Sequence, residues 1–270
     1  MKTYFVDAFT NQMFKGNPAA VCMVDSSISE GRMQNIATEI GFSETAFVQS
    51  ILPNSYSIRF FTPKKEIPLC GHATLAASKV LFETKPIDQI IFKNIEGLEL
   101  RIEKAGSKIK MQLPVYETEP TTVPNAMLDA LGIMTFIKSR YCPEPGMILI
   151  EIAGTDILKN LKPDFVALVK SYSGINGVLV TAKAENEQYD FHYRYFWPWA
   201  GTDEDPVTGA VQTFLTKYWA DKLHKKELHP YQSSARTGIM NTEFEWDHVF
   251  IYGEAVIVME GEWNIIKQNL

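Results

Sequence analysis

The chain has 270 residues, 46% of them hydrophobic and 21% charged, a composition typical of a folded globular protein and not of a disordered one. Its formal net charge of -6 and its scattered lysines and arginines argue against nucleic acid or an anionic membrane as a partner and favour a small molecule. We see no signal peptide and no membrane span, and the three cysteines lack the paired spacing of zinc sites or disulfide frameworks, so we expect a cytoplasmic protein.

The first part of the chain predicts mostly strands. Alternating residues over 1–9 predict the first strand, and the Gly-Asn-Pro turn at 16–18 separates it from a second strand over 20–24. Further strands are predicted over 45–49, 56–61, 89–93, 98–104 and 108–113, with a helix from His72 to about Phe82 between them.

A shorter helix comes before the strand at 45–49. Either Ser27 or Ser29 is its predicted N-cap, its apolar residues follow helical spacing, and Gly41 is its predicted stop. Glu44 therefore lies at a junction between a helix and a strand.

The segment from 116 to 125 is rich in Pro, Thr and Glu and shows no periodicity, so it is the predicted linker. We expect an N-terminal lobe over 1–116 and a C-terminal lobe over 117–270, with the last residues packing back on the first lobe. In the second lobe, strands are predicted near 148–152, 178–181, 191–196, 249–252 and 255–259, and a helix from about Gly209 to Asp221.

The two halves also align with each other. Residues 56–63 and 191–198 share aromatic, Arg, Phe and Pro positions, and with three extra residues in the second copy Gly71 aligns with Gly209. The sequence thus predicts an internally duplicated fold. Each copy places a glycine before a helix, and such a start offers unpaired N–H groups to an anion. The alternative is two ordinary helix starts that bind only water.

Five short blocks in one order resemble those of the phenazine-biosynthesis PhzF-like family. They are Gly16–Val21, Gly41–Phe47, Phe60–Pro63, Cys70–Leu75 and Glu204–Gly209, and the stretches 232–238 and 253–256 are similar to that family as well. The resemblance implies an α+β fold of the diaminopimelate epimerase type. In that fold two pseudo-symmetric lobes each wrap a curved mixed sheet, a half-barrel, around a central helix. It further implies a substrate site between the lobes and a homodimer.

The resemblance also implies the site residues. Glu44 matches the catalytic base or acid, and His72 and Asp205 match polar residues of the same cleft. Substrate contacts are expected from Asn17, from Gly71 and Ala73 at one helix start and from Gly209 and Ala210 at the other. Ala210 stands where the family commonly has Ser, so one hydroxyl donor is absent and the substrate need not be that of the phenazine pathway.

Each catalytic candidate also has a structural interpretation. In the catalytic interpretation, the apolar neighbours of Glu44 raise its pKa towards neutrality; in the structural one, Glu44 is a surface glutamate at a turn. Asp205 followed by Pro206 suits a helix N-cap, and His72 in a first helical turn is expected to be neutral.

We therefore expect an isomerase that needs no cofactor or metal and moves a proton, with migration of a double bond, on a small carboxylate-bearing substrate. One alternative is an amino-acid epimerase that uses Glu44 or Cys70 against Asp205. Cys70 aligns with Thr208, which is too weakly acidic to act as a second thiol, and this disfavours a two-thiol racemase. The other alternative is a non-catalytic protein that binds small carboxylates or serves as an interaction scaffold.

Overall fold

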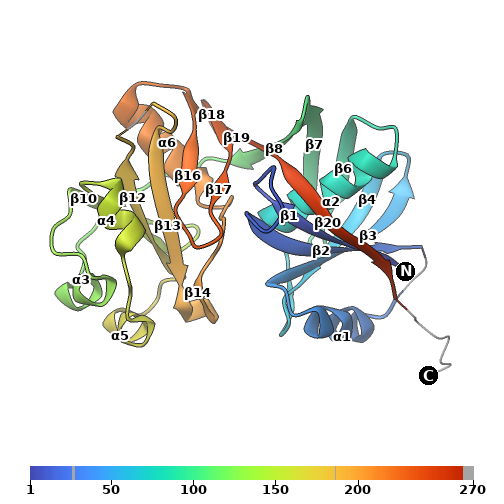
Figure 1. Cartoon of the computed structure of the whole chain (residues 1–270), viewed down its shortest axis with the longest axis horizontal. Helices are drawn as coiled ribbons and strands as arrows, with labels where there is room; N and C mark the ends of the chain where they lie inside the picture. The colour runs from blue at the N-terminus through green and yellow to red at the C-terminus, as the bar shows by residue number, and fades with distance from the viewer. Residues whose placement is uncertain (26–27, 186, 264–270) are drawn as a thin grey trace. The chain divides into compact units, whose positions relative to one another are not determined.

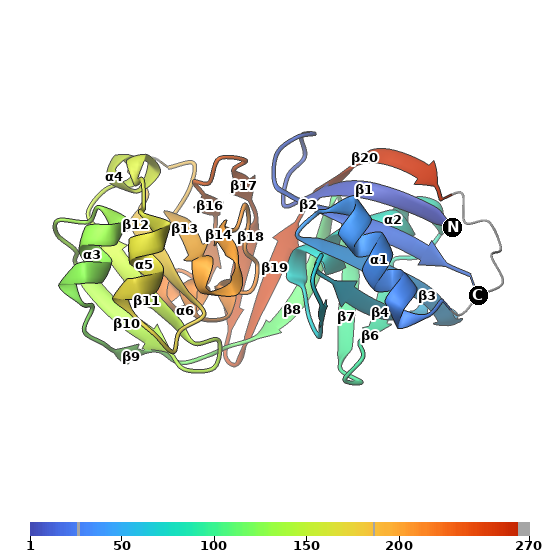
Figure 2. The ribbon, with the colours of Figure 1, turned by 90° about the horizontal axis from the view of Figure 1, so that it is seen from below.

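The computed structural model describes residues 1–25, 28–185 and 187–263, and the chain forms two compact units (Figures 1 and 2). Unit 1 consists of Met1–Gln112 and Ile251–Leu270, and unit 2 of Leu113–Phe250. Each unit combines helices with a sheet of parallel and antiparallel strand pairs, so the expected α+β class is confirmed. Within the described ranges, no helix is both long enough and apolar enough to cross a membrane.

Unit 1 is a curved sheet with two helices. Its strands follow the order β8-β7-β6-β4-β3-β2-β1-β20, and β5 pairs with β4. The elements are β1 (Lys2–Ala8), β2 (Asn17–Val24), α1 (Glu30–Ile40), β3 (Glu44–Leu52), β4 (Ser55–Phe61), β5 (Glu66–Ile67), α2 (Gly71–Thr84), β6 (Gln89–Lys93), β7 (Glu99–Ala105), β8 (Lys108–Pro114) and β20 (Ala255–Glu262).

The two helices of unit 1 differ in their surroundings. Helix α2 packs against β1, β2, β3 and β20 and is buried along most of its length, so it is the central helix of the unit. Helix α1 buries one face against Phe47 of β3 and Phe61 of β4. Ser29 caps its start through the N–H of Arg32, and Gly41, at φ 72°, ends it as predicted. Ser27, the other predicted cap, lies outside the described residues.

Unit 2 has a second sheet, with the order β17-β16-β13-β12-β11-β10-β9, and β14 pairs with β13. The elements are β9 (Glu119–Pro120), α3 (Asn125–Leu131), β10 (Lys138–Cys142), β11 (Met147–Ile152), α4 (Thr155–Asn160), α5 (Phe165–Ser171), β12 (Gly177–Lys183), β13 (Phe191–Trp197), η1 (Pro198–Ala200), β14 (Thr202–Glu204), α6 (Gln212–Leu223), β15 (Glu227–Leu228), β16 (Pro230–Gln232), β17 (Gly238–Ile239) and β18 (Asn241–Glu245). Strand β19 (His248–Gly253) carries the chain back to unit 1.

Helices cover both faces of the unit 2 sheet. Helices α3, α4 and α5 form an apolar cluster with Val178 and Val180 of β12. Leu179 and Thr181 alternate with these two residues along β12 and point to the opposite face. There Trp219 of α6 stacks on Phe191, with ring centroids 5.3 Å apart, and donates a hydrogen bond to Thr181 Oγ1 at 3.0 Å. Helix α6 is thus the central helix of unit 2.

The predicted internal duplication is present in the topology of both units. In unit 1, β1–β2 is antiparallel, β2–β3 parallel, β3–β4 antiparallel, and β5 pairs back on β4 before α2 begins. In unit 2, β10–β11, β11–β12, β12–β13 and β14–β13 repeat these directions before α6 begins. Each unit therefore builds the same strand order and then places its central helix.

One prediction about α6 is wrong. The helix begins at Gln212 and not near Gly209, because residues 209–211 form a turn. The carbonyls of Gly209 and Ala210 accept hydrogen bonds from the N–H groups of Gln212 and Thr213 in this turn. Asp205 accordingly does not cap α6, whose N-cap is Val211.

Candidate active site

Glu44 is the first residue of β3, directly after the turn that ends α1. The parallel register pairs it with Ala19 of β2, close to Asn17 at the start of that strand. Glu44 is only 4% exposed, so its interpretation as a surface glutamate is wrong. A buried carboxylate needs a partner, because taking a charge out of water is costly.

His72 supplies that partner. It lies in the first turn of α2, and its Nε2 is 3.0 Å from Glu44 Oε2. On the other side of the ring, Nδ1 is 3.2 Å from the side-chain nitrogen of Asn17. Three of the predicted site residues therefore meet around one imidazole. All of them belong to unit 1.

Cys70 joins this group, and the sequence did not predict that contact. It is the N-cap residue of α2, and its Sγ is 3.5 Å from His72 Nδ1. It is largely buried, and burial raises the pKa of its thiol. The available signal was its spacing of two residues from His72, because this spacing places both residues at the start of the same helix.

The two charged groups shift each other's pKa. Burial alone would raise the pKa of Glu44, but the positive charge of His72 and hydrogen bonds from His72 and Ser43 outweigh it, so this pKa is lowered. Burial would lower the pKa of His72, but its interactions with Cys70 and Glu44 raise this pKa well above the ordinary value. The sequence-based expectations of a raised Glu44 pKa and a neutral His72 are both wrong, because neither included the partner.

The start of α2 has features that an anion site needs, and binding of a carboxylate there stays a prediction. Gly71 is the first helical residue, and a Cβ added there would meet nothing within 4 Å, so space is open beside the backbone. The N–H of Ala73 points to the Cys70 sulfur. Backbone amides in this turn favour a negative group through the helix dipole.

The remaining predicted residues lie in unit 2. Asp205 is 8% exposed, and its Oδ2 accepts a hydrogen bond of 2.5 Å from Thr208 Oγ1. Gly209 and Ala210 follow in the turn before α6. The expectation that these residues and those of unit 1 contact one substrate stays a prediction.

Gln232, the last residue of β16, contacts the loop that carries Asp205, and sequence analysis did not single it out. Its side chain donates to the carbonyl of Asp205 and accepts from the N–H of Thr208, both at 2.7 Å. It is fully buried and so fixes the loop that carries Asp205. The family-like stretch 232–238 was the available signal.

The acid-base groups of unit 1 have no counterpart in unit 2. Glu44 begins β3, whereas the equivalent strand β12 begins with Gly177. The sequence alignment places Thr208 opposite Cys70 and Ala210 opposite His72. The cluster of Glu44, Cys70 and His72 is therefore not repeated at the equivalent positions of unit 2.

Glu44, Cys70 and His72 also form a set that could hold a metal ion. One donor atom from each lies within 4.8 Å of the others, and all three residues are buried. The sequence did not reveal this set, because Glu44 is far from the other two along the chain.

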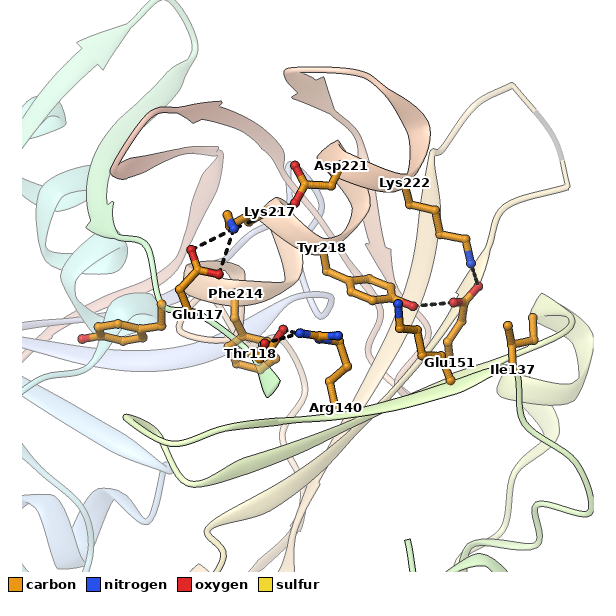
Figure 3. A pocket seen from close by; sticks show the side chains of 12 residues that line it. Glu117, Thr118, Ile137, Arg140, Glu151, Phe214, Lys217, Tyr218, Asp221 and Lys222 are labelled. Carbon is orange, nitrogen blue, oxygen red and sulfur yellow. Dashed lines mark hydrogen bonds and ion pairs between the residues drawn. The ribbon is translucent and has the colours of Figure 1, made fainter. Parts of the chain in front are cut away.

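A separate pocket of about 450 Å³ lies in unit 2 beside α6 (Figure 3). Two of its glutamates are paired with lysines of α6: Glu151 with Lys222, and Glu117 with Lys217 at 2.8 Å; Glu151 also accepts a hydrogen bond from the hydroxyl of Tyr218. None of the predicted site residues lines it. The site around His72 is therefore the better candidate for chemistry.

Comparisons with known proteins identify the family and the fold. The chain matches the phenazine biosynthesis-like protein family over residues 6–261. An uncharacterized isomerase of Halalkalibacterium halodurans is 41% identical over 263 residues, which cover 96% of this chain and 97% of that protein. The crystal structure of a phenazine biosynthesis PhzF family protein from Enterococcus faecalis matches with a TM-score of 0.90 and 34% identity, covering 96% and 97% of the two chains.

A more distant structure shares the fold alone. It is a predicted epimerase from Pseudomonas aeruginosa, with a TM-score of 0.74 and 19% identity, covering 97% of this chain and 99% of that one. These matches confirm the expected fold of the diaminopimelate epimerase type. The chain belongs to the phenazine biosynthesis-like, or PhzF-like, family and is an isomerase of that family.

Proposed function

We propose that this isomerase moves a proton on a small carboxylate-bearing substrate without a cofactor, and that Glu44 is its general base. The observation that carries the proposal is the buried ion pair between Glu44 and His72 at the start of α2. General acid-base catalysis needs a positioned proton acceptor in the correct ionisation state. The lowered pKa of Glu44 keeps it ionised and ready to accept a proton.

The same pKa limits the substrate. A carboxylate with a lowered pKa is a weak base, so it removes a proton only from an activated carbon, such as one beside a carbonyl and a double bond. The imidazolium of His72 lies 3.0 Å from the Glu44 oxygen. As Glu44 accepts the proton, negative charge develops on the substrate, and this cation is placed to stabilise it. We therefore propose an unsaturated carboxylic acid as the substrate class.

Migration of a double bond fits the geometry better than inversion. The donor atoms of Glu44, Cys70 and His72 lie within 4.8 Å of one another, so they address a bound substrate from one side. A proton that leaves one carbon and returns to another on the same face shifts the double bond. Inversion of a stereocentre needs a second group on the opposite face.

Substrate contacts are proposed as follows. The open space at Gly71 and the amides of the first turn of α2 take the carboxylate, with Ala73 and Asn17 beside them. Asp205, Gly209 and Ala210 of unit 2 are proposed as further contacts. The geometry of unit 1 does not bear on these three residues, so substitution of each one tests its role.

Deuterium exchange tests the proposal. Wild type, Glu44→Gln and Glu83→Gln are incubated in heavy water with a panel of small unsaturated and amino carboxylic acids, and mass spectrometry follows deuterium uptake. Glu83 is an exposed glutamate on α2 paired with Lys79, so its variant is the matched control. We expect uptake in wild type and Glu83→Gln and a loss of at least about 100-fold in Glu44→Gln.

Other outcomes would decide against the proposal. Uptake that persists in Glu44→Gln would exclude Glu44 as the base. Chiral analysis that detects inversion of an amino acid would favour the epimerase alternative. Panel members that bind to wild type, by thermal shift, yet take up no deuterium would favour a binding protein.

A further inference from the structure

Three side chains of different chemistry converge on one point in unit 1. A carboxylate comes from the first residue of β3, a thiol from the N-cap of α2 and an imidazole from its first turn. We propose that Glu44, Cys70 and His72 form a binding site for a thiophilic divalent cation, best matched by Zn²⁺, whose occupancy blocks proton transfer. The regulatory half of this inference rests on the function proposed above, whereas the binding half does not.

The distances suit a zinc ion. His72 Nε2 is 3.0 Å from Glu44 Oε2 and 3.9 Å from Cys70 Sγ, and all three donor atoms lie within 4.8 Å. With zinc bonds of about 2.0–2.3 Å, ligands of a tetrahedral site stand about 3.3–3.6 Å apart. Shifts of about 1 Å or less bring the three atoms to these separations and leave a fourth position for water.

The chemistry of the donors selects the metal. Sulfur and imidazole nitrogen favour zinc over magnesium or calcium, which prefer oxygen ligands throughout. Three protein ligands and one open position form a site from which the cation can also dissociate. The other two cysteines do not offer such a set: Cys22 contacts the hydroxyl of Thr3, and Cys142 contacts Glu144 at 3.8 Å.

Asn17 completes the surroundings of the imidazole. A histidine that binds metal through Nε2 carries its proton on Nδ1, and that N–H needs an acceptor. The amide of Asn17 lies 3.2 Å from Nδ1, and a half-turn of the amide presents its oxygen in place of its nitrogen. The ring is therefore held in the orientation that metal binding requires.

Binding would exchange protons for metal at the catalytic groups. The cation displaces the thiol proton of Cys70 and the Nε2 proton of the His72 imidazolium, and both protons go to the buffer. It also occupies the Glu44 oxygen that otherwise accepts the substrate proton. Removal of the metal by a chelator restores both groups, so the block is reversible.

Cobalt absorption tests the binding half without a substrate. The full-length protein is stripped with a chelator and titrated with Co²⁺ and then with Zn²⁺, in wild type, Cys70→Ser and Cys142→Ser. We expect a thiolate-to-cobalt charge-transfer band in wild type and Cys142→Ser that Zn²⁺ displaces, and no such band in Cys70→Ser. Zinc affinity measured by calorimetry should fall at least about 100-fold in Cys70→Ser and in His72→Asn.

The results separate the two halves of the inference. A wild type without the band, or equal zinc affinity in Cys70→Ser and Cys142→Ser, overturns the site. Circular dichroism checks that Cys70→Ser is folded, and His72→Asn repeats the test if it is not. If the site binds Zn²⁺ but deuterium exchange continues at saturating metal, the regulatory half is wrong; if wild type shows no exchange at all, the function proposed above fails while the metal site stands.

Discussion

At the scale of single residues, Glu44 and His72 depend on each other for their charge. Burial opposes charge on either one, and only the opposite charge of the partner makes the ionised pair favourable. Removing one partner leaves the other as an uncompensated buried group. This mutual dependence explains why a carboxylate that is 4% exposed remains ionised.

The pair predicts how stability depends on pH. Because the folded pKa of His72 is raised, its contribution is complete below its unfolded value of 6.5 and is lost as the pH rises through the folded value. Because the folded pKa of Glu44 is lowered, its contribution is present above 4.5 and is lost as the pH falls through the folded value. We expect the free energy of unfolding of wild type to fall more steeply above pH 6.5 than that of His72→Asn, by at least about 1 kcal/mol. Thermal melts of the two proteins across this pH range measure it. Parallel curves for the two proteins would contradict the ion pair.

Gly16 and Gly41 have similar backbone angles, but we expect their substitution by alanine to lower the free energy of unfolding by very different amounts. Gly16 has φ 66° and a Cβ there would lie 2.1 Å from the carbonyl oxygen of Ala8, whereas Gly41 has φ 72° and open space around it. We expect Gly41→Ala to cost about 1–2 kcal/mol from the left-handed backbone alone. Gly16→Ala adds a clash with backbone and should cost about 4 kcal/mol or more. Thermal midpoints of both variants check this, and equal losses would contradict it.

At the scale of elements, the two units repeat one arginine clamp. Arg59 on β4 binds Glu66 of β5 at 2.6 Å, and Arg194 on β13 binds Glu204 of β14 at 2.8 Å. In both units the guanidinium also lies over the phenylalanine two residues later in its own strand. Each clamp ties the short return strand to the strand that comes before the central helix. The repeated Arg in the two aligned segments therefore has a structural role.

The copies of the clamp differ in burial, which predicts unequal costs. The side chain of Arg194 is 9% exposed and also donates to the carbonyls of Leu158 and Leu161 at the end of α4. Arg59 is 24% exposed and keeps Glu30 as a second partner. We expect Glu204→Gln to cost about 2–3 kcal/mol and Glu66→Gln about 1 kcal/mol or less. Chemical denaturation of the two variants measures both, and a larger loss in Glu66→Gln would contradict the argument.

Periodicity in the sequence predicted which segments form helices and strands better than it predicted where those segments begin and end. Helix α1 was predicted with its cap and stop, because Ser29 and Gly41 act through local backbone geometry. The start of α6 was not, because the turn at 209–211 precedes it, and an Asp-Pro pair reads like a cap whether or not a helix follows. Local sequence does not distinguish these two cases.

Part of the predicted set of site residues meets in the structure, but the charges of these residues were not predicted. Motif resemblance named Glu44 and His72, yet only the pairing of β2 with β3 and the packing of α2 place them 3.0 Å apart. The contact of Cys70 with the same ring is local, because the two residues lie at the start of one helix. Shifts of pKa depend on such distances between segments far apart in sequence, so sequence patterns alone gave the wrong sign.

At the scale of the whole molecule, duplication of the fold and specialisation of its chemistry coexist. Both units build the same order of strands, but the groups equivalent to Glu44, Cys70 and His72 are Gly177, Thr208 and Ala210. A glycine, a threonine and an alanine keep the backbone path while removing the acid-base groups. At Gly177 a Cβ would lie 2.5 Å from the hydroxyl of Tyr195, so packing in unit 2 leaves no room there for a side chain such as that of Glu44.

Strand β20, with which the chain returns to unit 1, is predicted to stabilise the proposed site. Strand β20 pairs with β1 along its whole length, from Lys2–Glu262 to Ala8–Ala255, and it packs on α2 (Figure 1). Removing residues 251–270 therefore exposes β1 as an unpaired edge and uncovers the helix that carries Cys70 and His72. In hydrogen-exchange mass spectrometry we expect the truncated protein to lose protection in β1, β2 and α2, while β11, β12 and β13 of unit 2 stay protected in the same sample. Equal loss in both sheets would show that the two units unfold together, and unchanged protection in β1 would show that β20 contributes nothing to the stability of unit 1.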